Sequence, residues 1–336
     1  MNTTGFVKYA GALVALAICA ACSALRQAQG DIAGAPSTAS LNETYVGRTL
    51  FVNGRPVTAA RLSPQPRYAT IVPDRHAKSK SFEYIINDYE TSIFDYPKSD
   101  QQIGQITTNG GQGCTNALYG YGKKTFWIVT GESQISEFKV LKKPIKTLSV
   151  SVAQPSSCAM DTSGDLALGA LSNGDIVIFP HASGSGTVMT TPLAREYFDG
   201  YDNRGNLFAD GFNSSDGFEL VELPKGSSTF QTITTSNSVE FPGSVQWDGT
   251  YLTVSDQETA SLYQYTVSGT KATLKGTVSL AGAGDCAQTW IATGVVYCAD
   301  AGNNDAAVFK YPAGGSAIAV LTGNVNLPLG VVAAKK

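Results

Sequence analysis

The chain has 336 residues, which suits one large domain with an N-terminal extension or two small domains. Charged residues make up only 15% of it and glycine occurs 35 times, which favours an all-β protein with many tight turns. The net charge of -3 and the scattered basic residues argue against a nucleic-acid partner. The densest lysine group, Lys139 to Lys146, is interpreted as a solvated strand edge.

The chain begins with the features of an export signal. Lys8 precedes a run of small and apolar residues from Tyr9 to Ala21, which is too short to span a bilayer and matches the apolar region of a secretory signal. The run ends in Ile18-Cys19-Ala20-Ala21-Cys22-Ser23, which resembles a bacterial lipobox. This resemblance makes Cys22 the predicted lipidation site, although Cys19 stands where a lipobox normally has an aliphatic residue.

Two alternatives to lipidation remain open, namely an ordinary signal cleaved after Ala24 or Ala28 and an uncleaved anchor. All three interpretations place the domain outside the cytoplasm, as a membrane-anchored lipoprotein or as a secreted or periplasmic protein. Residues 1–22 are therefore predicted to be the export signal. Residues 23–78 are predicted to be a tether with one strand pair, Thr49–Asn53 and Arg55–Ala59, around the turn Asn53-Gly54.

A degenerate repeat begins after the tether. Each copy has a short apolar strand, a polar turn and a second strand that ends in an aromatic residue, often followed by proline. The copies start 40 to 44 residues apart, at Tyr84, Phe126, Leu166, Leu207, Tyr251 and Val295. A period of this length with four strand-sized pieces is typical of a β-propeller blade.

The first copy lacks an innermost strand of its own, and the last copy is followed by a strand-like segment, Leu327 to Ala333. We therefore expect the C-terminal strand to join the first blade and close the ring, which removes exposed sheet edges. The prediction is an all-β fold in which residues 79–336 form a six-bladed β-propeller with four-stranded antiparallel blades.

The sixth copy carries a family resemblance. Leu327-Pro328-Leu329-Gly330-Val331-Val332, with Val296-Tyr297-Cys298-Ala299-Asp300-Ala301-Gly302-Asn303-Asn304 and Val308-Phe309-Lys310-Tyr311, resembles the NHL-type repeat. The Arg that often follows the Asn pair in that family is replaced by Asp305. Similar propellers include the SMP-30/gluconolactonase and streptogramin-lyase groups, so the resemblance implies a fold rather than one activity.

Acidic and amide residues recur in the turns between the second and third strands, which should face the propeller's funnel. One interpretation is a mouth for a cation, a carbohydrate or a protein ligand. The interpretation that we favour is ordinary turn chemistry, because Asp and Asn bond their own backbone in tight turns. The candidate rim residues are Asp88, Glu90, Glu132, Asp210, Asp256 and Asp300.

A second set of carboxylates falls on or near the predicted innermost strands. Carboxylates around a central channel are able to bind Ca²⁺ or Mg²⁺, as the resemblance to SMP-30-like lactonases implies. The candidate metal ligands are Asp161, Asp199, Asp202, Asp248 and Asp285. Neither histidine, His76 in the tether or His181 in an outer turn, is placed as a general base, which disfavours a streptogramin-lyase-like enzyme.

Four cysteines lie outside the signal. Cys286 and Cys298 flank a predicted hairpin and are expected to form a disulfide in an oxidising compartment. Cys114 and Cys158 begin two innermost strands and either pair near the channel mouth or remain buried thiols.

The leading functional hypothesis is a monomeric binding or scaffold propeller at the cell envelope, held to the membrane by a lipid anchor, with no catalytic residues assigned. The alternative is a metal-dependent hydrolase of the SMP-30/gluconolactonase type. The lyase is the third hypothesis.

Overall fold

The computed structural model describes residues 43–46, 49–52 and 55–56, and residues 80–336 except 88–89, 109–110, 132 and 153. The chain divides into two compact units, Met1–Leu62 and Ser63–Lys336. In the first unit, β1 (Glu43–Val46), β2 (Thr49–Val52) and β3 (Arg55–Pro56) form an antiparallel sheet in that order. The β2–β3 pair confirms the predicted hairpin, whereas β1 falls where the sequence predicts only a tether. Cys22 and His76 lie outside the described residues.

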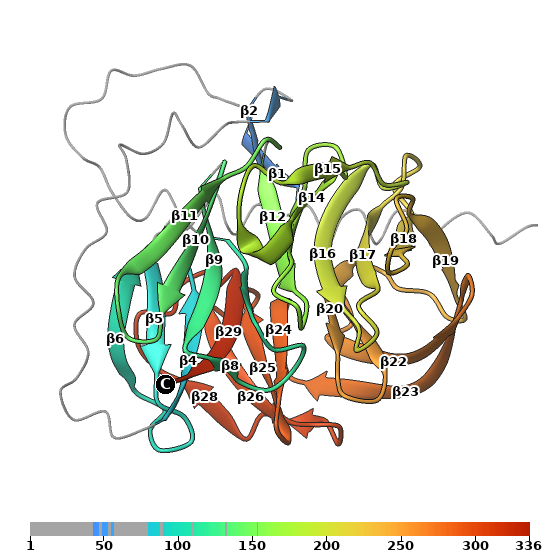
Figure 1. Cartoon of the computed structure of the whole chain (residues 1–336). Coiled ribbons are helices and arrows are strands. Elements are labelled where there is room, and N and C mark those ends of the chain that lie inside the picture. Colours follow the sequence, from blue (N-terminus) through green and yellow to red (C-terminus); the bar gives the residue numbers. More distant parts are fainter. Residues whose placement is uncertain are drawn as a thin grey trace, which may run out of the picture. The chain divides into compact units, whose positions relative to one another are not determined.

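Strands make up nearly all of the regular structure described in the second unit (Figure 1). The strands are β4 (Ser81–Ile86), β5 (Glu90–Phe94), β6 (Gln102–Thr107), β7 (Gly113–Thr115), β8 (Gly122–Lys123), β9 (Thr125–Gly131), β10 (Gln134–Lys139), β11 (Pro144–Ser149), β12 (Pro155–Met160), β13 (Leu166–Ala170), β14 (Ile176–Phe179), β15 (Thr187–Met189), β16 (Arg195–Tyr201), β17 (Leu207–Phe212), β18 (Phe218–Leu223), β19 (Gln231–Thr235), β20 (Pro242–Trp247), β21 (Leu252–Asp256), β22 (Ser261–Ser268), β23 (Lys271–Ala281), β24 (Cys286–Ala292), β25 (Val295–Asp300), β26 (Asp305–Lys310), β27 (Gly315–Ser316), β28 (Ala319–Leu321) and β29 (Gly330–Lys335). One short 3-10 helix, η2 (Pro180–Ala182), follows β14.

The strands of this unit pair in antiparallel quartets. Three quartets stand as separate four-stranded sheets, β11-β10-β9-β7, β12-β13-β14-β15 and β24-β25-β26-β28. The quartets β16–β19 and β20–β23 join into one larger sheet through a short parallel contact between β19 and β23, and β27 also pairs with β23. The fold is therefore all-β and propeller-like, with four-stranded antiparallel sheets.

The C-terminal strand completes the first sheet, as the sequence predicts. β29 runs antiparallel to β4, from Gly330 opposite Ile86 to Lys335 opposite Ser81, in the sheet order β6-β5-β4-β29-β8. The two-residue strand β8 then adds to the other edge of β29 in parallel, which the sequence did not predict. The count of six blades stays a prediction.

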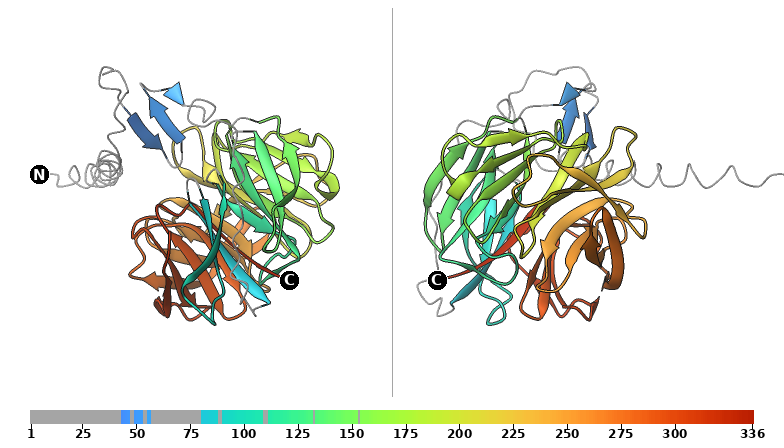
Figure 2. Two further views of the ribbon diagram at one scale, coloured as in Figure 1. Left: turned by 90° about the vertical axis from the view of Figure 1, so that its left-hand side faces the viewer. Right: turned by 45° about the vertical axis from the view of Figure 1, so that its right-hand side comes forward.

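Burial explains why the strands differ in sequence. Inner strands such as β4 and β13 are buried along nearly their whole length, because each sheet packs between two neighbours, and they read as continuous apolar runs. Outer strands such as β11 alternate between buried and exposed side chains. Figure 2 shows the sheets of this unit side by side from two further directions. Within the described residues, no helix has the length and apolar character needed to cross a membrane.

Candidate functional site

Five innermost strands, β7, β12, β16, β20 and β24, line one narrow central cavity of about 40 Å³. The lining combines apolar and polar groups, including Thr115, Met160, Asp199, Gln246 and Trp290. One water molecule needs roughly 10–15 Å³ of such volume, so the cavity has room for a few water molecules or one small ion.

Two glutamine side chains tie neighbouring sheets together around this cavity. The Gln288 Oε1 atom accepts the backbone N–H groups of Gly113 at 3.2 Å and Val331 at 2.9 Å, while Nε2 donates to the Gly113 carbonyl at 3.0 Å. The Gln246 Oε1 atom accepts the Ile291 N–H at 2.7 Å. The innermost strands are too far apart to form a continuous ladder, so these amides satisfy backbone groups that would otherwise be buried without partners.

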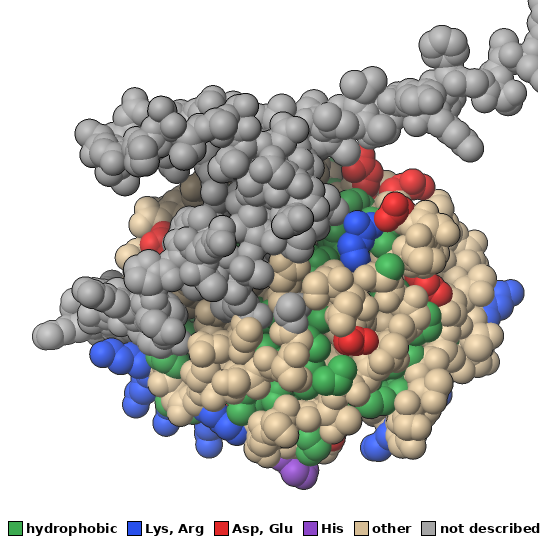
Figure 3. Space-filling model, turned by 90° about the horizontal axis from the view of Figure 1, so that it is seen from above, with side chains coloured by type: hydrophobic (Ala, Val, Ile, Leu, Met, Phe, Trp, Pro, Cys, Tyr) green, Lys and Arg blue, Asp and Glu red, His purple; other side chains and the backbone are tan. Residues whose placement is uncertain are grey.

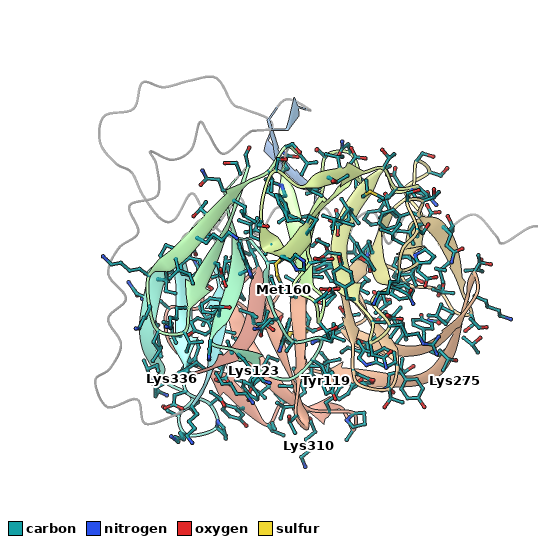
Figure 4. The ribbon with its side chains drawn as sticks, viewed as in Figure 1. Tyr119, Lys123, Met160, Lys275, Lys310 and Lys336 are labelled. Carbon is teal, nitrogen blue, oxygen red and sulfur yellow. A yellow bond between two sulfur atoms is a disulfide. The ribbon has the colours of Figure 1, made fainter. Side chains whose placement is uncertain are left out.

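The segment Asn116–Tyr121, which we call the plug segment, lies across the lower end of the channel. The Trp290 Nε1 atom donates to the Gly120 carbonyl at 2.7 Å, and Gln246 Nε2 donates to the Leu118 carbonyl at 3.1 Å. Figure 4 shows Tyr119 of this segment on the lower side of the unit and Met160 nearer its centre. The plug segment therefore fills space that would otherwise continue the channel.

Asp199, on β16, is the one carboxyl group among the residues that line the cavity. It is only 6% exposed, and neither carboxylate oxygen has a well-formed hydrogen bond among the described residues. Burial raises the pKa of Asp199 to about 7, although the nearby Ser157 hydroxyl lowers it in part. A carboxylate without a counter-charge in a small polar cavity is able to accept a proton or attract a small cation.

Glu196 lies next to this carboxylate and is missing from the residues predicted from sequence. Its oxygens accept hydrogen bonds from the Ser156 hydroxyl at 2.5 Å and the Ser157 hydroxyl at 2.6 Å. Burial, followed by the charge of Asp199, raises the pKa of Glu196 well above its usual range. A β-bulge between Glu196 and Phe198 inserts one extra residue into the strand. Because of it, the side chains of Glu196 and Asp199, which are three positions apart, lie on the same side of the strand and both contact the Ser157 hydroxyl.

Asp210 was predicted on the ligand rim, and the structure buries it completely. Its Oδ2 atom accepts the Gly243 N–H at 3.2 Å, while Oδ1 has no hydrogen-bond partner among the described residues. Burial, followed by the charge of Glu196, raises the pKa of Asp210 well above its usual range. Asp210 is therefore a buried carboxyl group rather than an exposed residue of the rim.

The structure does not bring the five predicted metal ligands together. Asp161, Asp202 and Asp248 lie in turns after innermost strands, where each accepts backbone N–H groups two to four residues ahead at 2.6–2.9 Å. Asp285 instead precedes β24, and only Asp199 lines the cavity. Among the described residues, no group of three His, Cys, Asp or Glu side chains is placed to hold a metal.

The rim aspartates also turn towards the backbone. The Asp256 carboxylate accepts the N–H groups of Glu240 at 3.0 Å and Phe241 at 3.2 Å. The Asp300 carboxylate accepts those of Gly284 and Asp285 at 3.0–3.1 Å. These contacts tie the entry of an innermost strand to the end of the second strand. Each carboxylate also accepts an N–H of its own turn at 3.1 Å, from Glu258 and from Asn303 respectively, which supports the turn-chemistry interpretation for these two positions.

Of the remaining rim candidates, only Glu90 lies among the described residues. Glu90 is half-buried at the start of β5, and burial raises its pKa. Asp88 and Glu132 lie outside the described residues. Figure 3 looks onto the upper face, where the uncovered surface is mostly uncharged and acidic side chains gather near a basic one. The Arg195 guanidinium pairs with Asp216 at 2.6 Å.

The expected disulfide between Cys286 and Cys298 is present, and Cys114 and Cys158, for which pairing was left open, also form one. Cys114 and Cys158 join β7 to β12 beside the cavity, and Cys286 and Cys298 join β24 to β25. The second pair is offset in the ladder, where Cys298 lies opposite Thr289, and a bulge after Cys286 brings the two cysteines within reach. Two disulfides are typical of proteins in an oxidising compartment.

His181 lies where the sequence places it, in the turn between the third and fourth strands of its sheet. Its side chain is 78% exposed and 3.8 Å from Asp165, outside the cavity lining. His181, the one histidine that is described, therefore lies outside the lining of the channel.

Comparison with known proteins shows a likeness of fold. No protein-family model matches the chain, and no curated protein matches its sequence. The structure is similar to a chain of the nidogen/laminin complex, with a TM-score of 0.60 and 12% identity over 76% of this chain and 98% of that chain. It is also similar to a proposed 6-phosphogluconolactonase from Bacteroides uniformis ATCC 8492, with a TM-score of 0.50 and 11% identity over 73% and 84% of the two chains.

At these identities the likeness concerns the fold alone, and it confirms a propeller-like arrangement. The NHL-type repeat and the lipoprotein signal stay predictions.

Proposed function

We propose that the chain is an exported β-propeller that serves as a binding or scaffold module at the cell envelope. The filled channel is the observation that carries this proposal. Glutamine side chains and the plug segment occupy the centre of the ring, and about 40 Å³ remains. Small-molecule sites usually offer about 300–1,000 Å³, so this small volume argues against a sugar or lactone substrate in the cavity. Partners of the protein would then bind its outer surface.

The proposal includes a ring of six blades. Six quartets of strands each match one copy of the sequence repeat. They are β6-β5-β4-β29, β11-β10-β9-β7, β12-β13-β14-β15, β16-β17-β18-β19, β20-β21-β22-β23 and β24-β25-β26-β28. The short parallel contact between β19 and β23 is then an accessory contact between the outer strands of two neighbouring blades. Six sheets around one axis leave the lower and upper turns as the surfaces available to partners.

The proposed location of the protein at a membrane depends on lipid attachment at Cys22. We expect the full chain, produced in a bacterial host with a radiolabelled fatty acid, to carry the label and to fractionate with membranes. Cys22→Ser should lose both properties, and Cys19→Ser, the matched control three residues earlier, should keep them. Label that persists in Cys22→Ser would contradict lipidation at this residue.

Asp199 is the one observation that favours the alternative, a metal-dependent hydrolase. A cation at this unpaired carboxylate would stabilise the folded state and raise the melting temperature. Our proposal predicts that millimolar Ca²⁺ or Mg²⁺ leaves the melting temperature unchanged and that gluconolactone is not hydrolysed. A rise in melting temperature that disappears in Asp199→Asn, together with lactone hydrolysis, would establish the hydrolase instead.

A further inference from the structure

Eight lysines that are scattered in sequence meet at one edge of the second unit, beside the end of β29. Lys124 N–H donates to the Lys335 carbonyl at 2.7 Å, and Lys336 N–H donates to the Lys80 carbonyl at 2.9 Å. Val140 N–H donates to the Lys124 carbonyl at 2.9 Å, which brings in the adjacent turn. We call the following set the lysine ridge: Lys80, Lys123, Lys124, Lys139, Lys142, Lys143, Lys335 and Lys336.

The ridge concentrates positive charge that nothing described in the structure neutralises. Seven of its side chains are exposed and Lys335 is half-buried. The two ion pairs found among the described residues, His181–Asp165 and Arg195–Asp216, include none of these lysines. The whole chain has a net charge of -3, so the ridge is a strong local departure from the average surface.

This arrangement carries a cost to folding. Lys123 lies directly beside Lys335 in the β8–β29 pair, and like charges at paired positions repel each other. Lys124 has a φ of 67°, in the left-handed region that an asparagine or glycine adopts with less strain. Uncharged residues at positions 123 and 335, and a glycine or asparagine at position 124, would make the folded state more stable. Lysines at these positions are therefore better explained by binding to an anionic partner than by folding.

The composition of the ridge indicates a membrane surface as that partner. It contains lysine and no arginine, and the point charge of lysine suits diffuse attraction to a fluid anionic surface, whereas arginine suits a defined bidentate site. Tyr119, a residue type enriched at membrane interfaces, is 47% exposed on the same lower side as Lys123 and Lys336 (Figure 4).

We propose that the lysine ridge docks the propeller onto bilayers rich in anionic phospholipid headgroups. This proposal rests on the location at the cell envelope proposed above. The attraction between the lysines and the lipid headgroups does not require the lipid anchor at Cys22. A single acyl chain gives only marginal membrane binding, and a basic patch is one of the second signals that makes binding stable. The ridge would also orient the unit, with the edge formed by β8 and the end of β29 towards the membrane.

The test uses the full chain carrying Cys22→Ser, so that no lipid contributes to binding. Co-sedimentation should show binding to vesicles of phosphatidylcholine mixed with phosphatidylglycerol, little binding to pure phosphatidylcholine, and loss of binding at high salt. Each lysine near an anionic surface increases partitioning about fivefold. The triple variant Lys123→Gln, Lys139→Gln, Lys142→Gln should therefore bind about 100-fold more weakly.

A matched variant removes the same charge elsewhere, by Lys225→Gln, Lys271→Gln and Lys275→Gln, and should bind within a few-fold of the parent. Equal loss in both triple variants would overturn the ridge, because only net charge would then matter. Equal binding to neutral and anionic vesicles would overturn it too, and so would ridge-dependent binding to an RNA duplex without vesicle binding. Failure of lipid labelling at Cys22 would affect the anchor and leave this result unchanged.

Discussion

Glu83 provides a direct test of how burial controls the stability of this fold. The side chain lies on β4 and is completely buried. Its oxygens accept the Tyr297 hydroxyl at 3.0 Å and the Tyr96 N–H at 3.0 Å, and Tyr121 of the plug segment lies 2.8 Å from Tyr297. Burial raises the pKa of Glu83 to about 8, against the lowering effect of these hydrogen bonds.

The sign of the pH dependence follows from proton binding. Between pH 4.5 and about 8 the folded state holds the Glu83 proton and the unfolded state has released it. The free energy of unfolding therefore falls as pH rises through this window, by up to about 1.4 kcal/mol per pH unit. From pH 5 to pH 8 the contribution of Glu83 decreases by about 3–4 kcal/mol.

Glu83→Gln should remove this contribution, because the amide has the shape of the protonated acid. We expect the variant to match the parent at pH 5 within about 1 kcal/mol and to exceed it by about 3–4 kcal/mol at pH 8. Urea unfolding followed by tryptophan fluorescence measures both, since all three tryptophans lie in the second unit. Glu240→Gln, the same change at an exposed residue, is the control. Parallel pH profiles for parent and Glu83→Gln would refute the reasoning.

Three further changes test the centre of the ring. Gly169→Ala should lose about 2–3 kcal/mol of stability, because its Cβ would lie 1.8 Å from Glu196 Oε2 and disrupt the serine contacts, as measured by urea unfolding. Gln288→Leu should lose about 3 kcal/mol or more, since it leaves three backbone groups unpaired, and should lower the melting temperature accordingly. Replacing both Cys114 and Cys158 by Ala should lose about 4 kcal/mol, from the chain entropy of a 44-residue separation.

The glycine and the disulfide changes each have a comparison within the chain. Gly217→Ala, whose Cβ would meet nothing closer than 3.3 Å, should be nearly neutral. Removal of Cys286 and Cys298 should cost less, about 3 kcal/mol, because they are only 12 residues apart. Equal losses for the two disulfides would mean that the enclosed loop length does not set their contribution.

The strand positions could be predicted because the signal is local and repeated. A second strand such as β13 is a short apolar run buried along its whole length, and it follows the polar turn between Asp161 and Asp165. The closing role of β29 also followed, because the first copy of the repeat lacked an innermost strand and the last copy was followed by one.

The candidate site could be predicted only in part, because its contacts depend on local irregularities and on distant chain segments. Asp199 was among five aspartates that looked equivalent, and only the structure separates it from the turn-capping Asp161, Asp202 and Asp248. Glu196 was missed because a bulge changes which side of the strand it faces. The glutamine contacts join residues up to 175 positions apart, which no local pattern reveals.

The lysine ridge shows how charge should be interpreted in a repeat protein. Lys80, Lys123 and Lys139 look dispersed along the sequence, and the group at Lys139 to Lys146 looks like a solvated edge. In a propeller, however, turns that are one period apart lie next to each other on the same face. Lys80 and Lys123 are 43 positions apart, which is close to one period of the repeat. The C-terminal strand β29 pairs with β4 and β8 and so lies beside both lysines. Charge patches in such folds therefore become visible only when residues are compared at equivalent positions of the repeat, and dispersed lysines in sequence do not exclude a basic surface.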